Sequence, residues 1–424
     1  MSKSSSSLGL GAGHSPSPPT RQTLTAMSLA FDFDSPIDRR ATSSSKWNRY
    51  QGRDVVPLWV ADMDFRCAPA IVQALRTRVD HGVFGYTDPP AELAPTIAQA
   101  LLRDHGWRIE PDWIVWLPSL VVGLNVVSRA FAEEGDDILT SVPIYPPFLS
   151  APLNGKRNAV RVPLALEAQS PQPRWVWDMA ALEQSTGPRA RLLLLCSPHN
   201  PTGRVWTRRE LEQLADFAIR HDLIVCSDEI HCGLVLDQDK QHIPLASLSE
   251  EIAARTVTLM SASKTFNLPT LGCAFAIASN PDLRARVRRV MAGIVHHVGG
   301  LGYTATLAAY AHGRDWQLAL LDYLRDNRDL AYQAINAMPG LRTWHVEATY
   351  LAWIDANSMG VDSPLRFFEE AGVGLYDGAL FGAPGYLRLN FACPRSILAA
   401  ALERMARAAG DRASAAASRS SRRT

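Results

Sequence analysis

Short, continuous apolar runs alternate with amphipathic stretches through most of the chain. Six of the runs have the length of a β-strand: residues 113–117, 137–142, 190–196, 223–227, 256–260 and 273–278. Runs without polar alternation are typical of strands buried on both faces, as in a parallel sheet covered by helices. The pattern therefore predicts an α/β protein with a large, mostly parallel sheet.

The stretch after Trp206 has the signals of a helix. Thr207 can cap its first turn, and Glu210 stands three residues later, as in a capping box. Apolar residues then recur on one helical face: Leu211, Leu214, Ala215 and Ala218. A helix between the runs at 190 and 223 makes a β-α-β unit. A series of such units forms an open sheet whose ligand lies beyond the carboxyl ends of the strands.

From about residue 300 the pattern changes to long helical stretches, followed by three strand-like runs: YLAWID (350–355), GVGLY (372–376) and YLRLNFA (386–392). This change predicts a smaller α+β domain. We place a large domain at 59–298, the small domain at 299–407, and a segment at 27–58 that packs with the small domain.

Both ends of the chain differ from the middle. Residues 1–26 are rich in Ser, Gly and Pro, and residues 408–424 are rich in Ser, Ala and Arg, so we expect a disordered extension and a disordered tail. The first segment lacks the apolar core of a secretory signal, and Met27 is an alternative start.

Composition excludes several classes of protein. The 424 residues are 47% hydrophobic and 20% charged, which is typical of a globular protein with two or three domains. Residues 1–26 carry a net charge of +2 and residues 408–424 of +3, which leaves −4 of the total of +1 on the rest. An acidic body does not favour nucleic acid. No apolar run reaches the ~20 residues of a membrane span.

The six cysteines are scattered and include no C-x-x-C pair. We therefore expect no zinc site and no disulfide framework. We expect a reducing, cytoplasmic location. His296 and His297 are adjacent and cannot face one metal ion together on a helix, so no metal is predicted.

Polar residues follow three of the predicted strands. Asn200 lies in the loop SPHNPTG, Asp228 and His231 in SDEIH, and Lys264 in SASKTFN, between Ser261 and Thr265. Taken singly, the Asn loop is more often a plain turn and the lysine a surface residue. Together on one rim, they suit an aromatic cofactor with a protonated ring nitrogen, a phenolic oxygen, an aldehyde and a phosphate.

Nine segments carry a resemblance to a known family: FDFDSPIDRRATSSSKW (31–47), PLWVADMDF (57–65), HGVFGYT (81–87), PIYPPF (143–148), SPHNPTGRVW (197–206), SDEIH (227–231), SKTFNL (263–268), ATYLAW (348–353) and LRLNFACPR (387–395). The chain resembles the fold type I pyridoxal-phosphate enzymes of the class I/II aminotransferase superfamily. Within it, the first two segments, SDEIH and SKTFNL resemble the cystathionine β-lyase, or C-S lyase, group of MalY/PatB type.

The resemblance implies roles for single residues. Lys264 matches the lysine that holds pyridoxal 5′-phosphate covalently and later moves the substrate's α-proton. Asp228 matches the carboxylate that pairs with the pyridine nitrogen, Asn200 the amide that binds the phenolic oxygen, and Tyr145 the ring stacked on the cofactor. The implied phosphate ligands are Ser261, Ser263 and the backbone amides of Leu120 and Val121 at a helix start.

Two further residues follow from the resemblance. Arg388 matches the guanidinium that grips the substrate carboxylate at two points. Tyr86 matches a tyrosine that, in related homodimers, reaches the phosphate in the neighbouring subunit, so a homodimer is expected. A structural ion pair is the alternative for Arg388.

Some positions depart from the family pattern. Ser119 stands where the lyase group usually has glycine, and Leu117 where it usually has threonine. His231 replaces a tyrosine common in aminotransferases, and its own role is open. Gly272 stands where many aminotransferases have a phosphate-binding arginine. His231 and Gly272 both favour the lyase group.

The resemblance implies a C-S β-lyase that cleaves cystathionine or other cysteine S-conjugates to a thiol, pyruvate and ammonia. An aminotransferase would use the same lysine and the same carbanion, so it stays the alternative. A ligand-sensing regulator built on this fold would need a DNA-binding domain, which 26 polar residues ahead of the body cannot contain.

Overall fold

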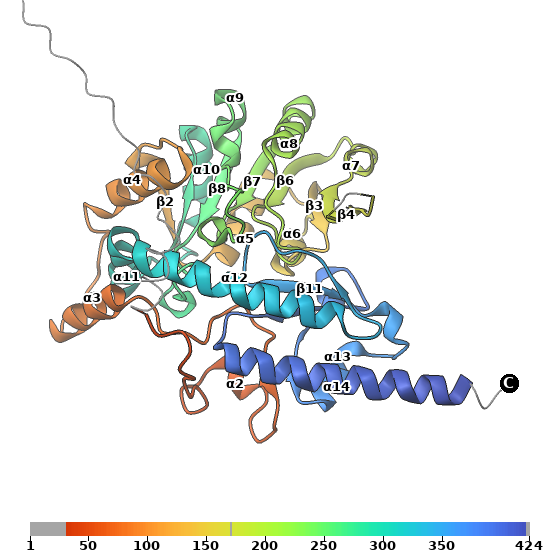
Figure 1. Cartoon of the computed structure of the whole chain (residues 1–424). Coiled ribbons are helices and arrows are strands. Elements are labelled where there is room, and N and C mark those ends of the chain that lie inside the picture. The colour runs from red at the N-terminus through yellow and green to blue at the C-terminus, as the bar shows by residue number, and fades with distance from the viewer. Residues whose placement is uncertain (1–30, 170–171, 421–424) are drawn as a thin grey trace, which may run out of the picture.

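The computed structural model describes residues 31–169 and 172–420, and its larger part is built on a twisted sheet (Figure 1). In spatial order the eight strands are β2 (Ile114–Leu117), β9 (Ala274–Ile277), β8 (Thr256–Met260), β7 (Ile224–Asp228), β6 (Ala190–Cys196), β3 (Asp137–Val142), β4 (Asn158–Glu167) and β5 (Arg174–Trp177). Strands β8, β7, β6, β3 and β4 run parallel to one another. The large, mostly parallel sheet predicted from the apolar runs is confirmed.

Two strands of the sheet run against the others. β9 lies antiparallel between β2 and β8, although its apolar run is as continuous as those of the parallel strands. The edge strand β5 pairs antiparallel with β4. Neither strand was among the predicted runs, and polar residues and Pro163 interrupt β4. Burial on both faces gives a continuous apolar run whichever way a strand points.

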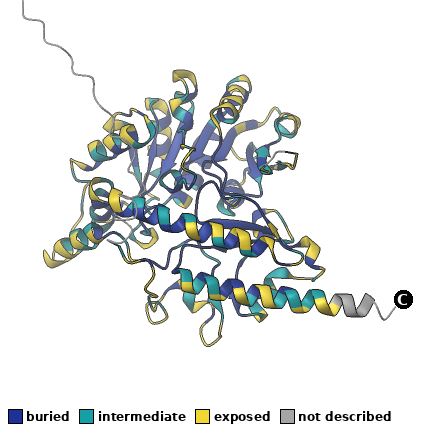
Figure 2. Ribbon diagram, viewed as in Figure 1, coloured by how far each residue is buried: buried dark blue, intermediate teal, exposed yellow. Residues whose placement is uncertain are grey.

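The central strand β6 shows why its apolar run has no polar alternation. Leu192 and Leu194 point into one apolar layer, which they share with α5 (Leu120–Phe131), whereas Leu193 and Leu195 point into the opposite layer with α8 (Arg208–Arg220). Both layers are dry, so both sets of side chains are apolar. Figure 2 shows these strands as buried beneath helices with exposed outer surfaces.

The helix predicted after Trp206 is α8, and its capping box is present. The Thr207 hydroxyl accepts a hydrogen bond from the Glu210 backbone nitrogen, and a Glu210 carboxylate oxygen accepts one from the Thr207 nitrogen. The other helices of the larger part are α3 (Pro69–Asp80), α4 (Leu93–His105), α6 (Pro147–Asn154), α7 (Met179–Ser185), α9 (Glu250–Ala253), α10 (Pro281–Met291) and α11 (Gly300–His312).

The carboxyl-terminal part has a sheet of its own, as predicted from residue 300 onward. Its strands pair antiparallel in the order β10 (Arg342–Thr343), β11 (Leu351–Asp355), β14 (Tyr386–Asn390) and β13 (Tyr376–Asp377). Its helices are α12 (Arg314–Asn336), α13 (Pro364–Glu370) and α14 (Arg395–Ser420). The run GVGLY, expected as one strand, is divided between this sheet and a second, two-stranded one.

The second sheet joins the amino-terminal segment to the carboxyl-terminal part. β1 (Val56–Pro57) pairs in parallel with β12 (Val373–Gly374), and the Tyr50 hydroxyl donates to Glu369 at 2.6 Å. A single helical turn, α2 (Ser45–Asn48), precedes β1. Tyr50 and β1 thus contact the carboxyl-terminal part. The expected segment 27–58 and the other domain boundaries stay predictions.

The two chain ends have different outcomes. The extension 1–26 and the alternative start Met27 lie outside the described residues. α14 continues to Ser420 and thus differs from the disordered tail predicted from residue 408, because an alanine-rich stretch favours a helix that has already begun. None of the helices within the described ranges is both long and apolar enough to cross a membrane.

Candidate active site

A cavity of about 220 Å³ opens where the parallel strands of the large sheet end. The loops after β6 and β8 contribute Asn200 and Lys264, the last residue of β7 is Asp228, and β14 contributes Arg388. All predicted site residues except Tyr86 line this cavity: Leu120, Val121, Tyr145, Asn200, Asp228, His231, Ser261, Ser263, Lys264 and Arg388. The topology thus brings together residues that are up to 268 positions apart, from Leu120 to Arg388.

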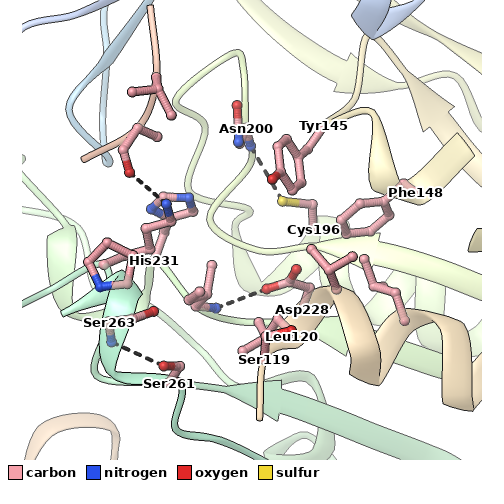
Figure 3. A pocket seen from close by; sticks show the side chains of 18 of the residues that line it. Ser119, Leu120, Tyr145, Phe148, Cys196, Asn200, Asp228, His231, Ser261 and Ser263 are labelled. Carbon is pink, nitrogen blue, oxygen red and sulfur yellow. Dashed lines mark hydrogen bonds between the residues drawn. The ribbon is translucent and has the colours of Figure 1, made fainter. Parts of the chain in front are cut away.

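Asp228 ends β7 and is 5% exposed (Figure 3). One carboxylate oxygen accepts a hydrogen bond from the Ile230 nitrogen at 3.1 Å. Burial raises the pKa of Asp228 from 3.8 to about 7, and the Ile230 bond lowers it less than burial raises it. Within the described residues it forms no ion pair, so its charged form calls for a cation supplied by a ligand in the cavity.

Lys264 lies in the turn that follows β8. Its Nζ donates a hydrogen bond to the Ala61 carbonyl at 2.6 Å. Burial, and then the charge of Arg388, lower the pKa of Lys264 from 10.5 to about 8, while Asp62 and Asp228 oppose that shift. An amine with this pKa is partly neutral near pH 7.5 and can therefore act as a nucleophile or base.

The groups predicted to bind the phosphate line the cavity around the start of α5. Ser119 caps α5 by accepting a hydrogen bond from the Val122 nitrogen at 3.3 Å, and the next residues are Leu120 and Val121. Free backbone N–H groups at a helix start favour a bound phosphate. Serine at position 119 thus supplies a cap where the lyase group usually has glycine.

Ser261 and Ser263 stand beside that helix start (Figure 3). Ser261 donates to the Cys273 carbonyl at 2.7 Å and accepts from the Ser263 nitrogen at 3.1 Å. The Ser263 hydroxyl is therefore the freer of the two to meet an anion. Gly272 has φ of +54°, a left-handed conformation that an arginine there would adopt only with strain.

Arg388 is 1% exposed and reaches the cavity from β14. Its guanidinium donates to the Asn200 side-chain oxygen at 2.9 Å and to the Trp59 carbonyl at 3.1 Å, and it lies 4.9 Å from the Tyr376 ring centre. Its Nε has no hydrogen-bond partner among the residues that the structure describes. Within residues 31–169 and 172–420, Arg388 forms no ion pair with a carboxylate, so the alternative of a structural ion pair finds no support. Burial lowers the pKa of Arg388 to about 10.

His231 is 2% exposed and lies one turn past Asp228. Burial, followed by the charges of Lys264 and Arg388, holds its pKa well below the usual 6.5, so the ring is neutral. Its Nδ1 is buried and finds no hydrogen-bond partner in the described part of the chain. His231 lines the cavity, as predicted for a cofactor-binding residue.

Tyr86 does not reach the cavity of its own chain. Its side chain is fully exposed, and Val83 and Phe84 beside it are 61% and 63% exposed. The predicted role of Tyr86 in a neighbouring subunit stays a prediction.

Sequence reasoning missed other residues that line the cavity. Tyr376 stacks under Arg388, and Phe148 and Cys196 lie near Tyr145 (Figure 3). Val60 and Ala61 come from the segment WVADMDF, which the sequence marked without assigning it a role. The position of Cys196 at the end of β6 was a usable signal, whereas nothing local marks Tyr376.

The donor set fits pyridoxal phosphate. A buried carboxylate without a cation, an amine of lowered pKa, an aromatic face and a helix start stand in one cavity. No group of three or more His, Cys, Asp or Glu side chains within the described ranges is arranged to hold a metal ion.

Comparisons with known proteins agree with this chemistry. Residues 53–405 match the model of the aminotransferase class I and II family. Cystathionine beta-lyase PatB of Bacillus subtilis (strain 168) is 34% identical over 388 residues, which cover 88% of this chain and 98% of that protein.

Two solved structures are close in fold. The crystal structure of OvoB has a TM-score of 0.87 and 48% identity, and the match covers 89% of this chain and 99% of that one. Cystalysin from Treponema denticola, whose crystal structure contains a pyridoxal 5′-phosphate cofactor, has a TM-score of 0.85 and 31% identity over 90% and 99% of the two chains.

Proposed function

The chain belongs to the aminotransferase class I and II family, and we propose that it is a pyridoxal-phosphate-dependent C-S β-lyase that acts on cystathionine or other cysteine S-conjugates. The observation that carries this proposal is the meeting of Lys264, Asp228, Asn200 and Arg388 in one cavity. The relatives named cystathionine β-lyase, at 32–35% identity over most of the chain, support the lyase rather than the aminotransferase reaction.

The chain's residues divide the binding of the cofactor among them. Asp228 would pair with the pyridine nitrogen, Asn200 would donate to the phenolic oxygen, and Tyr145 would cover one ring face. Ser261, Ser263 and the backbone nitrogens of Leu120 and Val121 would hold the phosphate. Pyridoxal phosphate would be held by Lys264 at rest, and once the substrate's amine displaces Lys264 its ring would supply the acceptor for the electron pair that the α-carbon keeps after losing its proton.

Arg388 and Lys264 act on the substrate. Arg388 binds the α-carboxylate through two parallel hydrogen bonds, which Asn200 and Trp59 pre-orient by accepting from the same guanidinium. Lys264, once its amine is free, removes the α-proton. The thiolate then leaves from the β-carbon, and the remaining three-carbon fragment hydrolyses to pyruvate and ammonia.

The test is an assay of the purified enzyme with cystathionine, cystine and several cysteine S-conjugates, without any keto acid. Equal amounts of thiol and pyruvate are expected. If pyruvate and thiol stay absent and amino groups pass only to an added keto acid, the enzyme is an aminotransferase and the proposal fails.

We include in the proposal that the enzyme is a homodimer in which Tyr86 completes the phosphate site of the partner. The exposure of Tyr86, Phe84 and Val83 supports this assembly. A cytoplasmic location belongs to the same proposal and is supported by six cysteines that are all free.

A further inference from the structure

Residues 59–65, here called the wall segment, connect β1 to α3 and form one side of the cavity. Two backbone carbonyls of the wall segment accept hydrogen bonds from the two cationic side chains of the site. Ala61 O accepts from Lys264 Nζ at 2.6 Å, and Trp59 O accepts from Arg388 at 3.1 Å. The Tyr350 hydroxyl donates to the same Ala61 oxygen at 3.0 Å. The backbone of the wall segment therefore sets the direction of both Lys264 and Arg388.

The wall segment has no helix or strand. The side chains of Asn390 and Asn267 form hydrogen bonds with several of its backbone groups. Asn390 donates to the carbonyls of Val60 and Asp62, at 2.7 Å each. Asn267 binds both the nitrogen and the carbonyl of Met63 at 3.0 Å, and its own φ of 57° is left-handed. Strained backbone of this kind persists where its surroundings require it.

Two carboxylates of the wall segment belong to an ion cluster, which we define as Arg39, Lys46, Asp62 and Asp64. Lys46 lies 2.7 Å from Asp64, and Arg39 lies 2.7 Å from both Asp64 and Asp62. Lys46 also donates to the Asp62 carbonyl at 3.2 Å, and Arg39 to the Met63 carbonyl at 3.1 Å. Arg39 and Lys46 thus bind both the carboxylates and the backbone of the wall segment.

Two charged side chains of the cluster are deeply buried, and burial of an ion pair does not by itself stabilise a fold. The Lys46 side chain is 0% exposed and that of Asp64 is 2% exposed. Removing two such charges from water costs free energy that their attraction often does not exceed, so apolar side chains of similar size would stabilise the fold as well. What charged groups add is fixed orientation, since each hydrogen bond specifies the position of both partners.

We propose that the ion cluster is a positioning device for the active site: it fixes the wall segment so that the Ala61 and Trp59 carbonyls orient Lys264 and Arg388. This inference rests on the proposed roles of Lys264 as base and Arg388 as carboxylate ligand. Since one segment serves both residues, disturbing it changes proton removal and substrate binding together.

The test compares two double variants of the cofactor-loaded enzyme. Lys46→Met with Asp64→Asn removes one charge of each sign from the cluster. Arg328→Met with Asp237→Asn does the same to a buried pair outside the cavity, whose side chains are 10% and 12% exposed and 2.6 Å apart. We expect the first variant to lose about tenfold or more in kcat and to gain severalfold in KM, because small displacements of reacting groups are costly. The control should change both within twofold at a similar loss of melting temperature.

A second readout does not depend on turnover. The visible absorption of the loaded enzyme reports the titration of the Lys264 nitrogen that is joined to the cofactor. The titratable and charged groups that face this nitrogen are Asp62, Asp228, Arg388, His231 and Tyr350. Its pH midpoint should move in the Lys46/Asp64 variant and stay in place in the control. Unchanged kcat, KM and midpoint would show that the cluster is merely structural.

Asp62→Asn keeps the inference testable if the double variant does not fold, because Asp62 is 17% exposed and its loss is milder. Removing this negative charge should move the absorption midpoint to lower pH and lower kcat about threefold or more, and no change in either overturns the inference. If the wild-type enzyme releases no thiol from any S-conjugate, the proposed function fails, while the absorption comparison still decides the role of the cluster.

Discussion

The Arg388 guanidinium, on β14, donates to the side-chain oxygen of Asn200 at 2.9 Å, across the junction between the carboxyl-terminal part and the large sheet. Because the oxygen is occupied, the amide orientation is fixed and its nitrogen is left to donate into the cavity. The substrate-binding and cofactor-binding residues thus touch each other directly. Four predictions follow from this and the other contacts of the site.

Lys264→Ala should abolish β-elimination and leave the fold intact. Loss of a general base costs roughly 100-fold to 10,000-fold in rate, and loss of the covalent link adds to it. Steady-state release of pyruvate and circular-dichroism melting measure the two effects. Lys156→Ala, at a lysine side chain that is 76% exposed, is the control. Turnover above a few per cent of wild type would remove Lys264 from the site.

Asp228→Asn should change how the stability of the cofactor-free protein depends on pH. The folded-state pKa of Asp228 is raised from 3.8 to about 7 by burial, so its protonation stabilises the fold at low pH. This contribution is lost as pH rises from about 4 to about 7, by roughly 4 kcal/mol at most. Denaturant unfolding of both proteins should therefore show that wild type loses stability relative to Asp228→Asn as pH rises through this window.

Two controls sharpen this prediction. Asp112→Asn, at a carboxylate that is 74% exposed, should keep the wild-type pH dependence. Adding pyridoxal phosphate to the wild-type protein should flatten the loss, because a ring nitrogen that carries a proton supplies the missing cation. An identical pH dependence in wild type and Asp228→Asn would mean that the carboxylate is not desolvated as the structure indicates.

Arg388→Ala should raise KM by about tenfold or more for two unrelated S-conjugates, because it removes a charge-assisted two-point contact with the shared α-carboxylate. Arg388→Lys should rescue KM poorly, since an ammonium group lacks the planar fork. The ratio of thiol to pyruvate should stay the same. Arg395→Ala, at an arginine side chain that is 41% exposed, serves as the control. A lowered melting temperature with KM intact would instead indicate a structural arginine.

Tyr86 can be tested by mixing two inactive proteins. Lys264→Ala homodimers and Tyr86→Ala homodimers should each have low activity. Subunit exchange gives hybrids in which one site combines a wild-type Lys264 with the partner subunit's Tyr86, so activity should return toward half of the wild-type value per hybrid. If Tyr86 acts within its own chain, neither site of a hybrid is complete and mixing restores nothing. Sedimentation velocity checks that dimers form.

The positions of the strands and the cofactor-binding residues could be found in the sequence. β3, β6 and β8 begin and end at the predicted residues, because a strand buried on both faces excludes polar side chains along its whole length. Asn200, Asp228 and Lys264 were identified for a related reason. In a parallel sheet the carboxyl ends of the strands share one edge, so order along the chain already implies proximity in space.

Other features needed the tertiary structure. The sequence gives no sign that β9 is antiparallel, that GVGLY divides between two sheets, or that Tyr376 lies under Arg388. The ion cluster is the clearest case, since Lys46 resembles a surface lysine among serines until the fold buries it against Asp64. Local pattern determines which segments are strands and helices, because it depends on neighbours along the chain. Contacts between distant segments depend on how the whole core packs, and no short stretch of sequence contains that information.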